Sequence, residues 1–194
     1  MPSDDQTPTA DPGGEPGYWN PVSGVQLAVA SGALLGLTLA LLFSRGFIVI
    51  LDHANLAFHE AGHLFFAVLG STAALYGGTL GQLVFPTVAV LVFSWRREAV
   101  SACLAGAWFF ENLFNIARYM ADARARVLPL VGGGEHDWAL IFSRWGALHL
   151  DTRVASVTRG LGWAGIVLLW AWLCVRWWHG RGTPDQVPRQ NTPR

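Results

Sequence analysis

The chain contains no lysine and few charged residues of any kind. Its 194 residues include 13 basic and 13 acidic side chains, so the formal net charge is zero, and charged residues make up 13% of the total. A soluble domain carries about 25% charged residues, and nucleic-acid-binding proteins are usually basic. We therefore expect no nucleic-acid partner. Two cysteines, Cys103 and Cys174, both lie inside apolar blocks, so we expect small buried hydrophobic side chains and not a disulfide framework or a zinc knuckle.

Hydrophobic residues make up 52% of the chain and gather in long blocks. The blocks cover residues 22–43, 47–70, 81–95, 99–121 and 157–175. A helix that crosses a bilayer needs about 20 apolar residues. The pattern therefore predicts an all-α, polytopic transmembrane helical bundle with about five membrane segments in contact with the lipid bilayer. The block 81–95 is short and contains Pro86, which leaves a tilted span, a kinked span and a re-entrant hairpin open.

Both ends of the chain are polar and contain several prolines. Residues 1–21 are acidic and residues 179–194 lack an apolar run, so we expect two disordered tails around one transmembrane domain, residues 22–178. Residues 136–149 form an amphipathic, tryptophan-bearing stretch that we expect at the membrane interface. The predicted location is a multi-pass integral membrane protein, in the cytoplasmic membrane of a bacterium.

The motif His59-Glu60-Ala61-Gly62-His63 has the pattern HExxH and lies inside an apolar block. Positions i and i+4 share one face of a helix, so both imidazoles can bind one metal ion while Glu60 lies near the metal-bound water. Zinc lowers the pKa of such a water to about 7, and a carboxylate can pass the proton to a leaving amine. Ionisable groups are costly inside a membrane, so three within five residues indicate a functional site. The alternative is that hydrogen bonds between helices satisfy the histidines.

A zinc hydrolase also needs a third protein ligand. Asp122 is one candidate, because it shares a helical face with Asn115 and Tyr119. Asp137, which follows His136, is the other. Each aspartate has a second interpretation: Asp122 caps the end of a helix, and Asp137 caps the start of the next one.

These residues resemble the site-2 protease family of intramembrane zinc metalloproteases. The resemblance covers roughly residues 47–124 and rests on HEAGH in an apolar helix, then a Gly-rich segment, then Phe-Asn with an aspartate seven residues after the asparagine. It implies a metalloendopeptidase that uses Zn²⁺ to cleave a membrane-embedded protein or peptide. The implied roles are zinc ligands for His59, His63 and Asp122, general base for Glu60, and substrate positioning for Asn115.

The resemblance also implies a role for the Gly-rich segment. Residues 77–82 lie where the family has a hairpin that lines the active site, and such a hairpin could pair with an extended substrate as an added strand.

The sequence departs from the family pattern around the third ligand. The family's Leu-Asp-Gly is Ala121-Asp122-Ala123 here, and its Asn-Pro is Asn115-Ile116. These departures keep Asp137 open as the alternative ligand, with His136 as a positioning group beside it.

Three hypotheses for the function follow from the motif. The first is an intramembrane zinc metallopeptidase in which Glu60 activates the water. The second is a non-catalytic membrane protein that keeps the metal-site fold and acts as a binding or chaperone-like partner. The third is a haem or metal carrier, because helical bundles can hold such groups in their cores. Asp52 and His53, two turns before His59, are candidates for a supporting layer or a proton path.

Overall fold

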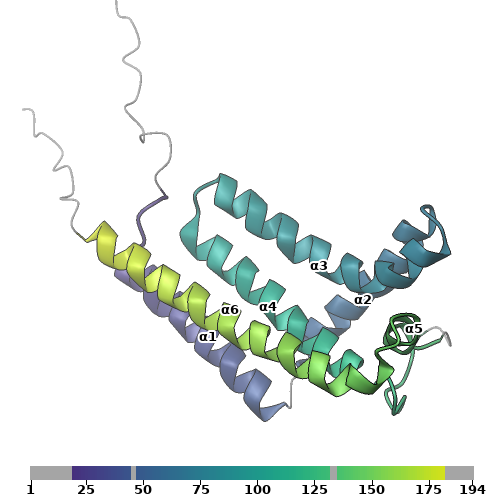
Figure 1. Ribbon diagram of the computed structural model, residues 1–194. Helices are drawn as coiled ribbons and strands as arrows, with labels where there is room; N and C mark the ends of the chain where they lie inside the picture. Colours follow the sequence, from purple (N-terminus) through teal and green to yellow (C-terminus); the bar gives the residue numbers. More distant parts are fainter. Residues whose placement is uncertain (1–18, 45–46, 132–134, 182–194) are drawn as a thin grey trace, which may run out of the picture.

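The computed structural model describes residues 19–44, 47–131 and 135–181, and within these ranges the chain is helical with no strand. The helices are α1 (Gly24–Phe43), α2 (Val49–Ala67), α3 (Ser71–Trp95), α4 (Ala99–Ala121), α5 (Asp137–Arg144) and α6 (Asp151–Gly180), with a 3₁₀ turn η1 (Leu148–Leu150) before α6. Figure 1 shows α1, α4 and α6 running side by side, with α3 along α4 and the short α5 at one end of the bundle. The predicted all-α bundle is confirmed.

Four segments of the described chain are helical, long and apolar enough to cross a membrane. They are Gly24–Phe43, Ser71–Trp95, Ala99–Ala121 and Leu148–Gly180. Their outer surfaces carry large exposed hydrophobic side chains such as Val25, Leu91 and Leu168. Such side chains are stable against lipid but not against water, so these helices indicate a membrane protein.

Helix α2 corresponds to the predicted block 47–70 but does not reach the hydropathy of the four long spans. It carries the HExxH motif together with Asp52 and His53, which lower its apolar content. One face of α2 is nevertheless strongly apolar and exposed, with Leu64, Phe65 and Val68 each more than 70% accessible. The buried polar residues of α2, Asp52, Asn55 and His59, therefore face the protein while its outer face matches a lipid environment.

The structure corrects the prediction for block 81–95. Helix α3 begins at Ser71 and continues through Pro86 to Trp95, so this segment is one 25-residue helix and not a short span or a re-entrant hairpin. Residues 77–82 lie within α3, where helical hydrogen bonds already use their backbone groups apart from the carbonyl of Gln82, which is opposite Pro86. They therefore present no free strand edge to a substrate, and the expected hairpin at this position is absent.

Glycines bring α2 and α3 into close contact. A Cβ atom at Gly62 would collide with the carbonyl oxygen of Gly77 and lie 2.9 Å from the Cα atom of Gly81. The connection between the two helices needs Gly70, whose φ of 103° is unfavourable for other residues. Small residues at a helix crossing let the two backbones approach closely. The Gly-rich segment thus serves helix packing, which places the α2 histidines directly against α3.

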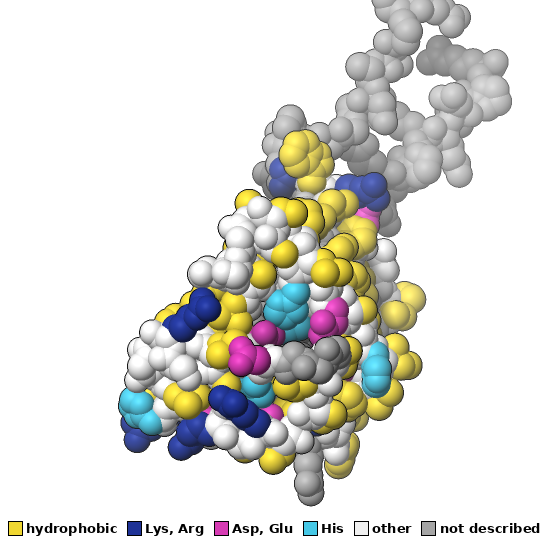
Figure 2. Space-filling model, turned by 90° about the vertical axis from the view of Figure 1, so that its right-hand side faces the viewer, with side chains coloured by type: hydrophobic (Ala, Val, Ile, Leu, Met, Phe, Trp, Pro, Cys, Tyr) yellow, Lys and Arg dark blue, Asp and Glu magenta, His cyan; other side chains and the backbone are white. Residues whose placement is uncertain are grey.

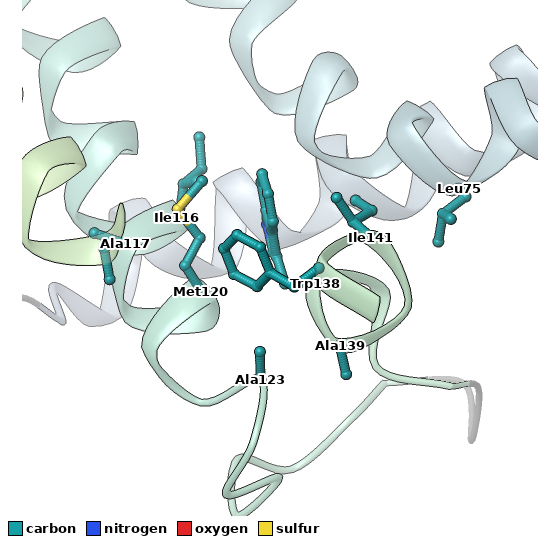
Figure 3. Close-up of a cluster of buried hydrophobic side chains, with 10 residues drawn as sticks. Leu75, Ile116, Ala117, Met120, Ala123, Trp138, Ala139 and Ile141 are labelled. Carbon is teal, nitrogen blue, oxygen red and sulfur yellow. The ribbon is translucent and has the colours of Figure 1, made fainter. Parts of the chain in front are cut away.

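A hydrophobic cluster fixes α5 against the end of α4. Trp138 and Ile141 of α5 pack with Ile116 and Met120 of α4, and Leu75 of α3 belongs to the same cluster (Figure 3). This segment was expected at the membrane interface as an amphipathic stretch. Its apolar face is instead buried in the protein, which holds the first turn of α5 in place.

The ends of the ordered bundle extend slightly beyond the predicted domain. Trp19 packs edge-on against Trp172 with ring centroids 5.0 Å apart, and the backbone N–H of Asn20 donates to the carbonyl of Arg97. Helix α6 continues to Gly180. The predictions of disorder for residues 1–18 and 182–194 lie outside the described residues. Of the two cysteines, both of which are free, Cys103 is buried and Cys174 is exposed.

Candidate metal centre

Two histidines and one aspartate meet at a single point between α2, α3 and α5. The Nε2 atoms of His59 and His63 lie 3.1 Å apart, and Asp137 Oδ2 lies 2.9 Å from the first and 3.1 Å from the second. Bonds of about 2 Å to zinc place tetrahedral ligand atoms about 3.3 Å from one another. The three side chains therefore form a group that could hold a metal ion.

The second ring nitrogen of each histidine, Nδ1, has its own hydrogen-bond partner. His63 Nδ1 lies 2.8 Å from the backbone oxygen of Ala74, and His59 Nδ1 lies 3.1 Å from Gln82 Oε1. A carbonyl oxygen only accepts hydrogen bonds, so Nδ1 carries the proton in both neutral rings. Each Nε2 then presents a lone pair to the other Nε2 and to the Asp137 carboxylate. Three electron-pair donors about 3 Å apart repel one another unless a proton or a metal cation lies among them, and with both Nδ1 atoms protonated this donor set could hold a divalent metal.

Asp137 is held in position from α4. It is the first residue of α5, and its backbone N–H donates to the Tyr119 hydroxyl at 3.1 Å. The Tyr119 ring also contacts His59 edge-on, with centroids 5.8 Å apart. The sequence placed Tyr119 on the same helical face as Asn115 but did not identify this contact, because Asp137 lies in a different helix.

The structure places Asp122 away from this group. Asp122 caps the C-terminal end of α4, and its carboxylate accepts hydrogen bonds from the backbone N–H groups of Val127 at 3.0 Å and Leu128 at 3.1 Å. Its remaining close neighbour is His136 Nε2 at 3.4 Å. The geometry therefore corrects the expectation for Asp122, supports its interpretation as a helix cap, and selects Asp137 as the third member of the group.

His136 lies behind the group and not in it. It is the N-cap of α5, where its Nδ1 accepts a hydrogen bond from the Ala139 N–H, so this role belongs to His136 and not to Asp137. Its ring stacks on Tyr119 at 4.1 Å. Burial lowers the pKa of His136, while the neighbouring Asp122 carboxylate acts in the opposite direction. His136 thus supports the residues that hold Asp137.

A hydrogen bond between Asn115 and Asp52 connects α4 to α2. The Asn115 side-chain amide donates to Asp52 Oδ1, and the other Asp52 oxygen accepts from the Ile48 N–H. His53 is bound to its own helix through Val49 O, at 2.6 Å from Nδ1. Asn115 therefore has a partner in the protein, and its expected role in positioning a substrate stays a prediction.

A cavity of about 680 Å³ opens beside the group, and Glu60 lines it together with both histidines and Asp137. About half of its other lining side chains are apolar, including Phe47, Leu56, Leu128, Leu130, Val131 and Leu140. In Figure 2, histidine and acidic side chains gather in the middle of one face, next to hydrophobic surface. Glu60 is thus placed to reach a molecule that contacts the metal position.

Replacing Gln82 by alanine should weaken metal binding at this site. Gln82 is buried and fixes the ring of His59 through Nδ1, and loss of such an outer contact typically costs about 10- to 100-fold in metal affinity. Competition with a zinc chelator on the detergent-purified protein measures this. Thr87→Ala, which removes a hydroxyl bonded only to Leu83 within α3, is the control and should bind zinc as wild type. An unchanged affinity in Gln82→Ala would contradict the assigned role.

No family model, curated protein or solved structure matches this chain in the comparisons made. We therefore infer its function from the side chains of the site.

Proposed function

We propose that this protein is an intramembrane zinc metallopeptidase, which hydrolyses a peptide bond in or near the membrane. The observation that carries the proposal is the meeting of both HExxH histidines with the Asp137 carboxylate beside a cavity lined by Glu60. Two histidines and one carboxylate are a common ligand set of catalytic zinc, which keeps one further position open for chemistry.

Each residue of the site has a defined task in this reaction. His59, His63 and Asp137 hold the metal, and Gln82 and the Ala74 carbonyl fix the imidazoles. Zinc, when bound, supplies a Lewis acid that polarises the scissile carbonyl and makes water more acidic. Glu60 accepts a proton from the attacking water and delivers it to the leaving nitrogen. The water oxygen bonds to the carbonyl carbon, the C–N bond breaks, and a carboxylate and an amine result.

The substrate we propose is a membrane-embedded protein or peptide. The cavity lies in a bundle with four candidate spans, and about half of its lining outside the metal group and Glu60 is apolar. An apolar lining favours apolar substrate side chains over water-soluble, highly charged ones. The cytoplasmic membrane of a bacterium is the location that we propose for this activity.

The alternatives fit the site less well. A haem iron with two histidine ligands needs them on opposite sides of the porphyrin, whereas the two Nε2 atoms here lie 3.1 Å apart on one side. A binding or chaperone-like protein would need the metal ligands but not Glu60. The position of Glu60 in the cavity therefore favours hydrolysis.

Glu60→Gln tests the proposal directly. We expect this variant to lose hydrolysis of an apolar fluorogenic peptide by at least about 100-fold, the usual contribution of a general base. Its zinc content should stay at the wild-type level, because Glu60 is not among the three ligands. Elemental analysis and a cleavage assay on the same detergent-purified samples measure both quantities.

Glu98→Gln is the matched control, since Glu98 precedes α4 and does not line the cavity. It should retain both zinc and activity. Undiminished hydrolysis by Glu60→Gln would refute the proposed mechanism. A wild-type protein that binds zinc and cleaves nothing would favour the non-catalytic binding protein.

A further inference from the structure

Arg118 supplies a positive charge to the cavity that holds the metal group. It lies on α4, one turn after Asn115, and lines the cavity together with Glu60. Its guanidinium lies 4.6 Å from the centre of the Phe47 ring, so an aromatic face supports it. Within residues 19–44, 47–131 and 135–181, no hydrogen bond or salt bridge involves its side chain.

Asp52, an acidic group of the same cavity, does not satisfy this arginine. Asp52 lies close enough to interact with Arg118 electrostatically. Both Asp52 oxygens, however, already accept hydrogen bonds, one from Asn115 and one from the Ile48 backbone. A guanidinium carries five N–H donors in a planar fork that matches a carboxylate. Arg118 is half-buried and has no such partner among the described residues, so its donors are suited to an anion that enters with the substrate.

The spacing along α2 gives the distance from Asp52, an electrostatic neighbour of Arg118 that lines the same cavity, to the metal group. Asp52 precedes His59 by seven residues on one helical face. A rise of about 1.5 Å per residue makes this about 10 Å. An extended peptide covers about 3.5 Å per residue, so about three substrate residues separate the two points. Leu56, one turn from each, lines the cavity between them and offers an apolar contact to this stretch.

We propose that Arg118 binds a carboxylate of the peptide substrate, about three residues from the bond that is cleaved. This inference rests on the proposed function, because it names the substrate class of the same site. The carboxylate is either the C-terminal carboxylate of the peptide or an acidic side chain at that position. In the first case, water adds across the third peptide bond from the C-terminus, and the products are a shortened peptide with a new carboxylate and a free tripeptide with a new amine.

Three peptides that share one apolar sequence test the proposal on the full-length, zinc-loaded protein in detergent. The first has a free C-terminal carboxylate, the second has a C-terminal amide, and the third has the amide and a glutamate three residues after the scissile bond. We expect wild type to cleave the first or third peptide at least about 30-fold faster in kcat/KM than the second, as for a buried charge pair. Arg118→Gln should remove this preference and leave cleavage of the second peptide unchanged.

Arg144→Gln is the matched control, because Arg144 is exposed at the end of α5 and does not line the cavity. It should keep the wild-type preference. Whether the first or the third peptide is preferred distinguishes the terminal from the side-chain carboxylate. Equal cleavage of all three peptides by wild type, unaltered in Arg118→Gln, would overturn the inference and leave the proposed peptidase function intact.

Binding supplies a readout that does not depend on catalysis. The Glu60→Gln protein should bind a fluorescently labelled carboxylate peptide more tightly than the amide, as measured by fluorescence anisotropy. The double variant Glu60→Gln/Arg118→Gln should bind both equally. If wild type cleaves no peptide while this difference in binding persists, the peptidase function fails and the carboxylate site stands. If the single variant binds acid and amide equally, the carboxylate site fails.

Discussion

Asp137→Ala is expected to lose zinc. The carboxylate of Asp137 is the member of the group that approaches both histidines, at 2.9 Å and 3.1 Å. Loss of an outer contact already costs about 10- to 100-fold in metal affinity, so removal of a ligand should cost at least about 100-fold. Elemental analysis and chelator competition on the detergent-purified variant measure the effect, and the helical content by circular dichroism should stay unchanged.

Asp122→Ala is the informative comparison, because the family resemblance implied the ligand role for this residue, with Asp137 as the alternative. Its carboxylate caps two backbone N–H groups after α4. Val127 is exposed and Leu128 is half-buried, so loss of these two hydrogen bonds should cost about 1 kcal/mol in stability. The variant should therefore unfold at a lower temperature and still bind zinc. Loss of zinc in Asp122→Ala with retention in Asp137→Ala would reverse the assignment made from the geometry.

Local sequence was sufficient for much of the fold and half of the site. The apolar blocks predicted the long helices, because membrane thickness sets helix length. The pair His59 and His63 could be predicted, because positions i and i+4 meet on any helix. Each of these inferences uses only residues that lie within a single helix.

From the sequence, the third member of the group could be named only as one of two candidates, Asp122 or Asp137. Asp137 lies 74 residues after His63, and it reaches the histidines only because Trp138 and Ile141 bury α5 against α4. Gln82 and the Ala74 carbonyl likewise come from α3, and no pattern within α2 indicates them. Asp122 has the spacing from Asn115 that a known family shows. In the structure its carboxylate instead accepts hydrogen bonds from the backbone just after α4.

The Gly-rich segment shows why one pattern supports two interpretations. Glycines at positions 77, 78 and 81 suit a hairpin beside a substrate, and they equally suit a helix that packs closely on another. Whether the segment forms a hairpin or a helix depends on which residues lie opposite these glycines. Gly62 of the HExxH motif lies against Gly77 and Gly81, and this mutual fit selects the helix.

Gly78→Ala should therefore abolish zinc binding without contacting the metal itself. A Cβ atom at Gly78 would collide with His59 Nε2 and lie 2.5 Å from His63 Nε2. Both imidazoles must then turn away, and their partners Gln82 and Ala74 hold the opposite sides of the rings. We expect a loss of at least about 100-fold in zinc affinity, as for a lost ligand and its support, measured by chelator competition.

Gly36→Ala provides the matched control. Gly36 lies in α1, and a Cβ atom there meets nothing within 4 Å. Alanine is favoured over glycine by up to about 1 kcal/mol in a helix, so this variant should be as stable as wild type or more stable, with full zinc content. Wild-type zinc affinity in Gly78→Ala would mean that the imidazoles do not lie against α3, and the same result would remove the physical basis for assigning Gln82 and Ala74 to their support.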